Sequence, residues 1–229
     1  MCYYIIMRDI PFVEKEFYHI YNRGVDKRNI ILDFNDLDRF IKSMREFNTI
    51  KPIGSIYENR ERKRGRRAST IQEKPLVNFI VYGINQNHFH FMLEQVAERG
   101  IEKFMHRFGT GFSKYFNARY KRSGALFQGK FKAKLVDSNE YLLHLSVYIN
   151  LNDRAHDRGR RASTLAKTSW LEYMGKVAER ICDKSIILGQ FKNIEGYRKF
   201  AESSLQSIIE RKILLDEWED AGIELANTA

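Results

Sequence analysis

The sequence is poor in cysteine and has no apolar run long enough to cross a bilayer. Its two cysteines, Cys2 and Cys182, offer neither a disulfide framework nor the spacing of a structural zinc site. The opening stretch from Met1 to Ile10 is interrupted by charges and is too short for a signal peptide. We therefore expect a cytoplasmic protein in a reducing compartment, with no membrane partner.

Acidic residues are also in short supply. The 29 Asp and Glu are outnumbered by 39 Lys and Arg, which gives a net charge of +10. Such a balance favours an anionic partner, and nucleic acid is the first candidate. The excess is partly local, because the heptapeptide RGRRAST occurs twice, at residues 64–70 and 158–164. The two copies account for six of the ten net charges, so the remaining chain is only mildly basic.

The flanks of the two heptapeptides are unrelated, which argues against duplication of a domain. Our hypothesis is that both copies were translated from one mobile DNA repeat that was inserted twice in frame. Both fall in expected loops, where insertions are tolerated. The alternative is a pair of arginine-rich arms that bind DNA, and the sequence leaves both interpretations open.

Apolar periodicity predicts six elements in the first two thirds of the chain. A polar segment over 57–75 separates the first two from the rest and is expected to be an exposed loop. The expected order is a strand over 16–24, a helix over 33–48, strands over 76–84 and 88–93 paired as a hairpin, a helix over 100–120 and a strand over 127–136. A further helix runs from residue 137 or 138 to about 152, and helices are expected after 185.

This order predicts an α+β fold of the ferredoxin-like βαββαβ type, with a four-stranded antiparallel sheet. The helix ending near 152 would be an addition to that unit, followed by a helical C-terminal tail. We expect one domain over 1–175, with loop insertions around 57–75 and 154–168, and a helical extension over 176–229.

Two histidines, His88 and His90, flank one apolar residue in the second hairpin strand. Alternate side chains of a strand share a face, so both imidazoles point one way, while Phe89, Phe91 and Leu93 point the other. Imidazole is a common ligand for divalent metals. A histidine pair on a strand is more often ordinary surface chemistry, so this pattern alone does not establish a metal site.

The helix ending near 152 carries Tyr148 and Asn152 four residues apart, on one helical face. This pair is compatible with a nucleophile beside a third, oxygen-donating metal ligand. For Tyr148 alone, a half-buried tyrosine packed on a helix is the favoured interpretation.

Five segments, in order along the chain, together resemble those of the single-tyrosine HUH transposases, and specifically the REP-associated tyrosine transposase branch. The segments are His19–Gly24, Asn87–His90, Tyr115–Asn117, Gly124–Lys132 and Tyr148–Asn152. The resemblance spans roughly residues 15 to 175 and leaves the C-terminal part of the chain outside it.

The resemblance implies a metal-dependent endonuclease and strand transferase that cleaves single-stranded DNA near palindromic hairpins. His88, His90 and Asn152 would hold a divalent cation, Mg²⁺ or Mn²⁺, and Tyr148 would form a covalent 5′-phosphotyrosine bond. The other four histidines, at 19, 106, 144 and 156, are not assigned as ligands. The sequence leaves open whether the protein works as a monomer or as a homodimer.

Two positions depart from the family pattern. Gln86 precedes the histidine segment and Asp153 follows Asn152, where the family usually has proline. Asp153 could lengthen the helix or place a carboxylate near the metal. Neither change removes a group that the reaction needs.

Polar and basic residues around the predicted turns are candidates for DNA contacts, because phosphates bind cations and exposed bases stack. They are Asn22, Arg23, Lys114, Arg119, Lys121, Arg122, Gln128, Lys130 and Lys132. The main alternative to an enzyme is a non-catalytic nucleic-acid-binding protein on the same fold, in which the histidines and the tyrosine only pack or stack.

Overall fold

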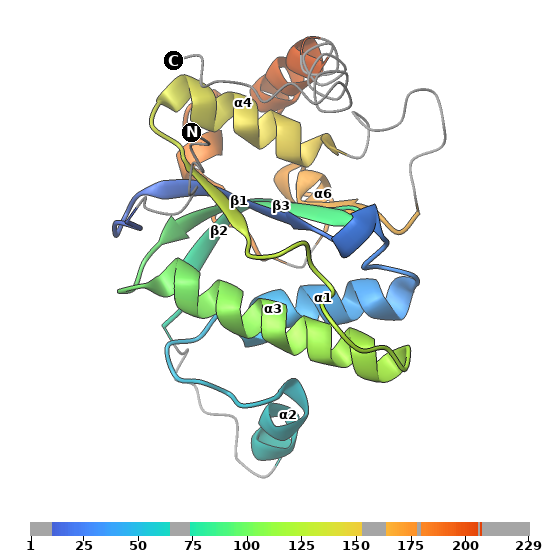
Figure 1. Ribbon diagram of the computed structural model, residues 1–229. Coiled ribbons are helices and arrows are strands. Elements are labelled where there is room, and N and C mark those ends of the chain that lie inside the picture. Colours follow the sequence, from blue (N-terminus) through green and yellow to red (C-terminus); the bar gives the residue numbers. More distant parts are fainter. Residues whose placement is uncertain (1–10, 65–73, 153–163, 178–179, 206, 208–229) are drawn as a thin grey trace, which may run out of the picture.

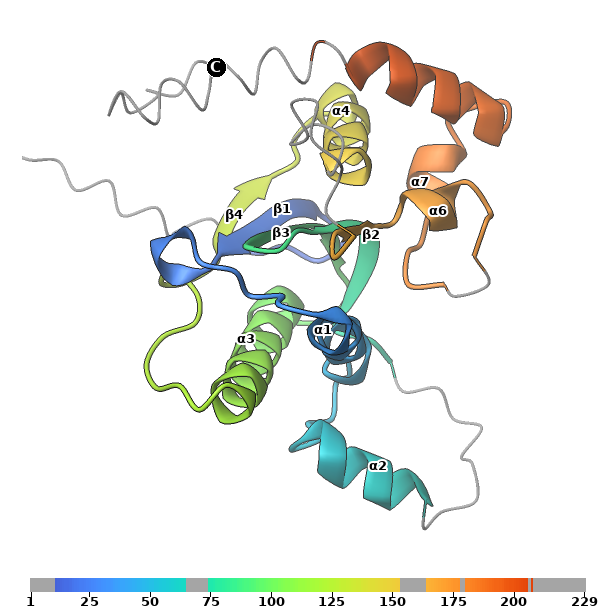
Figure 2. The same ribbon diagram turned by 90° about the vertical axis from the view of Figure 1, so that its right-hand side faces the viewer.

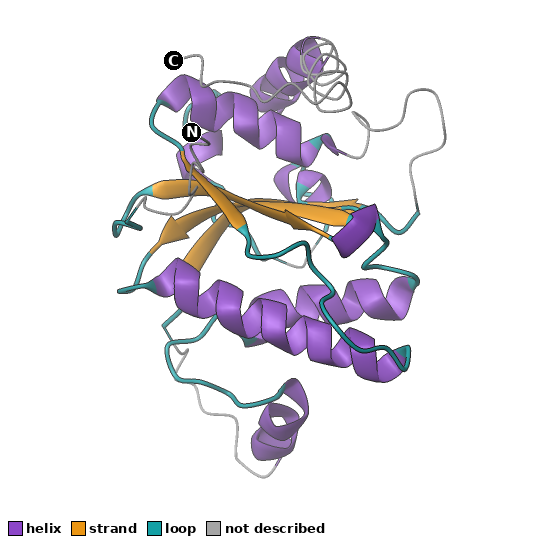
Figure 3. Ribbon diagram, viewed as in Figure 1, coloured by secondary structure: helices purple, strands orange, loops and turns teal. Residues whose placement is uncertain are grey.

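The computed structural model describes residues 11–64, 74–152, 164–177, 180–205 and 207. A central antiparallel sheet has the strand order β4-β1-β3-β2-β5. Figure 1 shows α1 and α3 side by side on one face of this sheet, with α4 and α6 on the other. Figure 3 shows the same three layers by type of element, with the strands between two sets of helices.

The first six predicted elements all form. They are β1 (Phe17–Arg23), α1 (Phe34–Glu46), β2 (Val77–Ile84), β3 (His88–Gln95), α3 (Gly100–Arg119) and β4 (Lys132–Leu135). The strand order 4-1-3-2 of the four predicted strands confirms the ferredoxin-like βαββαβ unit. The added helix is α4 (Asn139–Asn150), and Ser138 caps it by accepting a hydrogen bond from the backbone of Tyr141.

One face of the sheet buries an aromatic core against α1 and α3. Phe89 and Phe91 of β3 contact the rings of Phe40 and Phe108, which come from the two helices. These side chains are almost completely buried. The alternation predicted for β3 therefore holds, and it turns His88 and His90 toward the opposite face, under α4.

The second face is covered by α4, α6 (Trp170–Tyr173), α7 (Ser185–Leu188) and a helix over 194–205. Tyr197 of this last helix is buried, and its hydroxyl contacts Ser146 and Asn150 of α4 at 3.0 Å each. The described part of the predicted C-terminal extension thus packs against α4. The domain boundary between residues 175 and 176 remains a prediction.

The segment over 57–75 was expected to be a loop, and this is wrong for its first part, because α2 (Ile56–Arg64) forms there. The cause is a capping box at Ser55 and Glu58. The Glu58 backbone N–H donates to Ser55 Oγ at 3.1 Å, and the Ser55 N–H donates to the Glu58 carboxylate at 3.3 Å. Figure 2 shows α2 beyond α1, away from the sheet.

The sheet has five strands where four were expected, because β5 (Lys167–Thr168) pairs with the edge of β2. The strand predicted over 127–136 is shorter. Gly129 adopts φ +67 and turns the chain, so only Lys132–Leu135 pair with β1. A short 3-10 turn, η1 (Val25–Lys27), follows β1.

Most of both heptapeptides and Asp153 lie outside the described residues, so their predictions stay untested. Within the part of the chain that the structure describes, no helix has the length and apolar character needed to span a bilayer.

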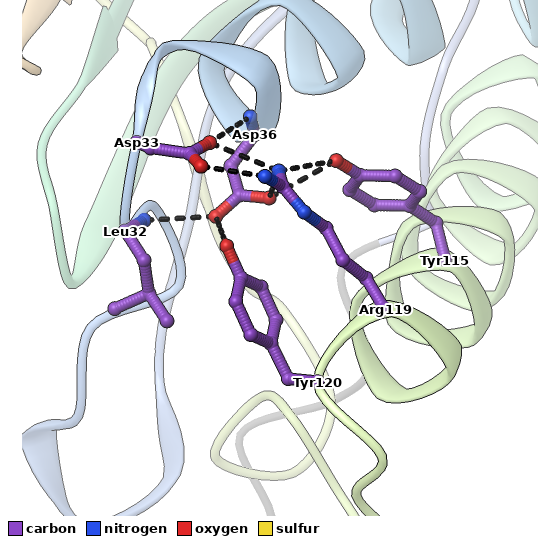
Figure 4. Close-up of polar contacts among 6 residues, drawn as sticks. All are labelled: Leu32, Asp33, Asp36, Tyr115, Arg119 and Tyr120. Carbon is purple, nitrogen blue, oxygen red and sulfur yellow. Dashed lines mark hydrogen bonds and ion pairs between the residues drawn. The ribbon is translucent and has the colours of Figure 1, made fainter.

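A buried carboxylate joins α1 to the end of α3 (Figure 4). Asp36 accepts hydrogen bonds from the hydroxyl groups of Tyr115 and Tyr120 and from Arg119, at 2.7 to 3.1 Å. Arg119 also pairs with Asp33 at 2.5 Å. Hydrogen bonding to Arg119 lowers the pKa of the Asp33 carboxyl below its usual 3.8. The contribution of Asp33 to stability is therefore complete above that pH, and it is lost as the pH falls through the lowered pKa.

We expect Asp36→Ala to destabilise the fold by about 3 kcal/mol, because it leaves several partly buried donors without their acceptor and Arg119 without its buried counter-charge. Urea denaturation followed by circular dichroism measures this change. Asp38→Ala is the matched control, since Asp38 is exposed on the same helix. Equal stability losses in the two variants would contradict a structural role for the cluster.

Candidate functional site

The predicted histidine pair lies on the sheet face beneath α4, where β3 runs beside β1. His90 is paired across the strands with Tyr21 and His88 with Arg23. His90 is buried, whereas His88 is partly exposed. The two imidazole rings are 5.2 Å apart, centroid to centroid.

His90 is held by a residue that was not assigned from sequence. His19 Nε2 lies 2.9 Å from His90 Nδ1, and the two rings stack with centroids 5.1 Å apart. Tyr21 stacks on both rings, at 4.8 Å from His19 and 5.7 Å from His90. With Nδ1 engaged by His19, Nε2 is the nitrogen of His90 that would face a metal.

Burial, together with the charge of Lys134, lowers the pKa of His19 to about 3. His19 is therefore neutral at physiological pH, and a single ring proton serves the His19–His90 contact. Because His19 is uncharged, it adds no positive charge beside His90, where a cation would bind.

His88 is oriented by the turn that precedes it. Its Nδ1 lies 2.6 Å from Asn87 Oδ1, an acceptor, so Nδ1 carries the proton and Nε2 is the acceptor nitrogen. That Nε2 lies 3.0 Å from Asn85 Nδ2. Both histidines are thus anchored through Nδ1, which is the usual arrangement for metal-binding imidazoles.

Asn152 follows α4 directly and is completely buried. Its Oδ1 accepts a hydrogen bond from Asn85 Nδ2, the same nitrogen that contacts His88. The acceptor atoms of two predicted metal ligands, His88 Nε2 and Asn152 Oδ1, therefore both face Asn85 Nδ2. The Nδ2 of Asn152 is buried and has no hydrogen-bond partner among the residues that the structure describes. Such an unpaired donor marks a place where an acceptor, such as water or a substrate oxygen, completes a site.

Tyr148 is half-buried on the face of α4 that looks at the sheet. Its ring meets His90 edge-to-face at a centroid distance of 5.3 Å, and it lies 6.5 Å from the ring of His19. The structure therefore brings together all four residues that were predicted to carry the chemistry, from β3 and α4.

Gly83 of β2 allows this approach. It is paired across the sheet with His90, and a Cβ at this position would lie 2.9 Å from the Ile149 carbonyl oxygen and 3.8 Å from Asn152 Cβ. The end of α4 therefore packs directly on the backbone of Gly83. As a result, Tyr148 and Asn152 lie close to His88 and His90.

We expect Gly83→Ala to lower DNA cleavage at least about tenfold, because an added methyl group forces the end of α4 away from β3. Cleavage rates measured with the folded variant test this. Gly109→Ala is the control, since a Cβ at Gly109 meets nothing within 4 Å. Unchanged cleavage in Gly83→Ala would show that the close approach is not needed.

The residues present fit a hard divalent cation. The described residues contain no cluster of three or more His, Cys, Asp or Glu that could hold a metal. The candidate set is instead two neutral imidazoles and one carboxamide, His88, His90 and Asn152. Mg²⁺ and Mn²⁺ accept such donors together with water and phosphate oxygens.

Five of the nine predicted DNA-binding residues gather where β1 ends and β4 begins. Arg23 Nε donates to Gln128 Oε1 at 2.5 Å, and Asn22 Nδ2 donates to the Gly129 carbonyl at 3.3 Å. Lys132 lies over the ring of Tyr21, with Nζ 5.9 Å from its centroid. Lys130 is exposed beside them.

The other four predicted DNA-binding residues lie along α3 and just after it. Lys114 and Lys121 are exposed, and Arg122 lies over the ring of Phe116 at 5.6 Å. Arg119 pairs with Asp33 and Asp36, which gives it a structural contact. For all nine residues, DNA contact remains a prediction.

The site contains four residues that sequence reasoning did not assign: His19, Tyr21, Asn85 and Asn87. A signal was available for the first two. His19 and Tyr21 alternate with the buried Ile20, so they share a face of β1, as His88 and His90 do on β3. The ferredoxin-like order predicts that β1 lies beside β3, but no sequence signal gives the register that places Tyr21 opposite His90.

Comparisons with known proteins give a family match. Residues 56–152 match the family model described as "Transposase IS200 like". The match includes both histidines and Tyr148, and it ends at Asn152. No curated protein matches the chain. Among solved structures, the chain is similar to a REP-associated tyrosine transposase bound to a REP hairpin, with 14% identity and a TM-score of 0.47. That similarity covers 77% of this chain and 93% of the other. Over residues 56–152, the chain is therefore similar to the IS200-like transposases.

Proposed function

We propose that the protein is a metal-dependent, HUH-type endonuclease and strand transferase of the REP-associated branch, acting on single-stranded DNA near hairpins. The observation that carries the proposal is the convergence of Tyr148, His88, His90 and Asn152 on one sheet face. A tyrosine hydroxyl beside a potential cation site suits attack on a phosphodiester.

In the proposed step, the Tyr148 oxygen attacks a DNA phosphorus atom and forms a phosphotyrosine bond to the 5′ side. The bond from phosphorus to the 3′ oxygen breaks, and that oxygen becomes a free 3′-hydroxyl. The proton lost by the phenol balances the one gained by the leaving oxygen. Because the phosphodiester is exchanged and not hydrolysed, the reverse step can rejoin DNA without a nucleotide cofactor.

The chain's own residues prepare this step by position. Asn87 and His19 fix the two imidazoles, and Gly83 lets α4 bring Tyr148 close to them. His88, His90 and Asn152 would hold Mg²⁺ or Mn²⁺, which polarises the scissile phosphate when bound. The cluster of Asn22, Arg23, Gln128, Lys130 and Lys132 would hold the DNA backbone.

The test is to incubate the protein with hairpin DNA that has single-stranded flanks, in the presence of Mg²⁺ or Mn²⁺. We expect a protein–DNA adduct that survives denaturation in detergent. If the DNA binds but neither ion supports an adduct, the alternative holds, and the protein is a nucleic-acid-binding module without catalysis.

A further inference from the structure

The side of α4 that faces away from the sheet carries two buried polar residues, Ser146 and Asn150. They are four residues apart and share a helical face, whereas residues two apart on a helix point to nearly opposite sides. Tyr148 lies midway between them in the chain, and its ring meets His90 on the sheet side. A buried carboxamide costs free energy unless its polar atoms are hydrogen-bonded. The partners of Asn150 therefore help to fix the end of α4 that carries Tyr148.

The first partner is Tyr197, in the helix over 194–205, which Figure 2 shows beside α4. The hydroxyl of Ser146 donates to the Leu143 carbonyl at 2.7 Å, so Ser146 Oγ is the acceptor for the Tyr197 hydroxyl at 3.0 Å. The same Tyr197 oxygen accepts from Asn150 Nδ2 at 3.0 Å. Burial raises the pKa of Tyr197 to about 12, so the hydroxyl keeps its proton at physiological pH. One hydroxyl thus links two successive turns of α4.

The second partner is Ser169, which bonds Asn150 to β2. Ser169 Oγ donates to Asn150 Oδ1 at 2.6 Å. Ser169 is itself fixed on β2, since its N–H donates to the Tyr82 carbonyl at 2.9 Å and its Oγ accepts from the Tyr82 N–H at 3.1 Å. Tyr82 directly precedes Gly83, the residue on which the end of α4 packs. Asn150 therefore joins α4, β2 and the C-terminal helix at one buried point.

These contacts act on the turn of α4 that carries the proposed chemistry. Tyr148 and Asn152 each lie two residues from Asn150, on the opposite side of the helix. A rotation or shift of this turn would move both of them at once. Ser169 and Tyr197 lie outside the segment that matches the family model, which ends at residue 152. The orientation of the turn is thus set partly by residues beyond that segment.

We propose that Tyr197 is a positioning residue, whose hydroxyl holds the last turn of α4 in the orientation that brings Tyr148 to the phosphate and Asn152 to the metal. The inference rests on the proposed function, because it concerns the orientation of the same nucleophile. It gives the helix over 194–205, which carries none of the proposed catalytic groups, a part in the reaction.

The test compares Tyr197→Phe with Tyr173→Phe in the full-length protein. Each change removes the hydroxyl of one buried tyrosine and keeps its ring, and the two rings pack together with centroids 5.3 Å apart. The Tyr173 hydroxyl donates to the Ile80 carbonyl at 2.9 Å, in β2 instead of α4. Tyr173→Phe is therefore the matched control for the loss of a buried hydrogen bond.

We expect Tyr197→Phe to slow adduct formation about tenfold at saturating DNA and Mn²⁺ while hairpin affinity is unchanged, because a displaced nucleophile attacks more slowly. Tyr173→Phe should lose a similar amount of thermal stability and react at the parental rate. Asn150→Ala breaks both links and should be at least as slow as Tyr197→Phe. Single-turnover kinetics below the melting temperatures measure the rates, and fluorescence anisotropy measures the affinities.

Hydrogen exchange of the α4 backbone, followed by mass spectrometry, measures the same link without any reaction. Amides at the end of α4 should exchange faster in Tyr197→Phe than in Tyr173→Phe. Equal rates of adduct formation in these two variants would overturn the inference, and so would equal exchange. If the parent protein forms no adduct but α4 exchanges faster only in Tyr197→Phe, the link to α4 stands and the proposed function fails.

Discussion

Replacement of Tyr148 by phenylalanine is expected to abolish the covalent protein–DNA adduct while leaving hairpin binding and the melting temperature close to those of the parent. The ring of Tyr148 packs edge-to-face on His90 at 5.3 Å, and phenylalanine preserves that contact. Only the hydroxyl is lost, and no other atom of the side chain can form an ester with phosphate. Gel electrophoresis under denaturing conditions, with labelled DNA, measures the adduct.

Two further tyrosines make this experiment specific. Tyr141 lies on the same helix under the ammonium group of Lys134, at 5.0 Å, and Tyr141→Phe should form adduct as the parent does. Tyr21 stacks on His90 and brings a second tyrosine hydroxyl to the site. If the adduct persists in Tyr148→Phe and disappears in Tyr21→Phe, the nucleophile is Tyr21 of β1 and not Tyr148.

The second large effect concerns the metal. We expect His90→Ala to reduce adduct formation by more than about 100-fold at every Mn²⁺ concentration, because the variant would lack a proposed metal ligand altogether. His88→Ala should behave alike. Chelation with EDTA should abolish the reaction of the parent, and added Mn²⁺ should restore it.

Replacement of His19 should give a different result, since we propose that His19 positions the ring of His90 and does not itself contact the metal ion. We expect His19→Ala to weaken Mn²⁺ binding about 10- to 100-fold, and excess metal should restore cleavage. Calorimetric titration with Mn²⁺ measures the affinity without DNA. His144→Gln, on the far side of α4 against Phe200, is the control. A His19→Ala protein with unchanged Mn²⁺ affinity would contradict the positioning role.

Local pattern was enough to predict most of the fold. The alternation of His88, Phe89, His90 and Phe91 predicted which face of β3 packs into the aromatic core against α1 and α3, since strand geometry has a strict period of two. Asp33 and Ser138 cap α1 and α4 close to the starts predicted for these helices, because capping depends on the next turn only. The loop expected from residue 57 onward was wrong as far as Arg64, although the capping box at Ser55 and Glu58 was visible in the sequence.

The ferredoxin-like order of elements and the residues with the right chemistry could be predicted from the amino-acid sequence, because period, caps and residue type are local properties. Three contacts could be found only in the folded chain: His19 supports His90, Asn85 links His88 to Asn152, and Gly83 admits α4. Folding also gives Arg119 two carboxylates on α1 as partners. These contacts join residues that are far apart along the chain. They depend on strand register and helix packing, which no local pattern specifies.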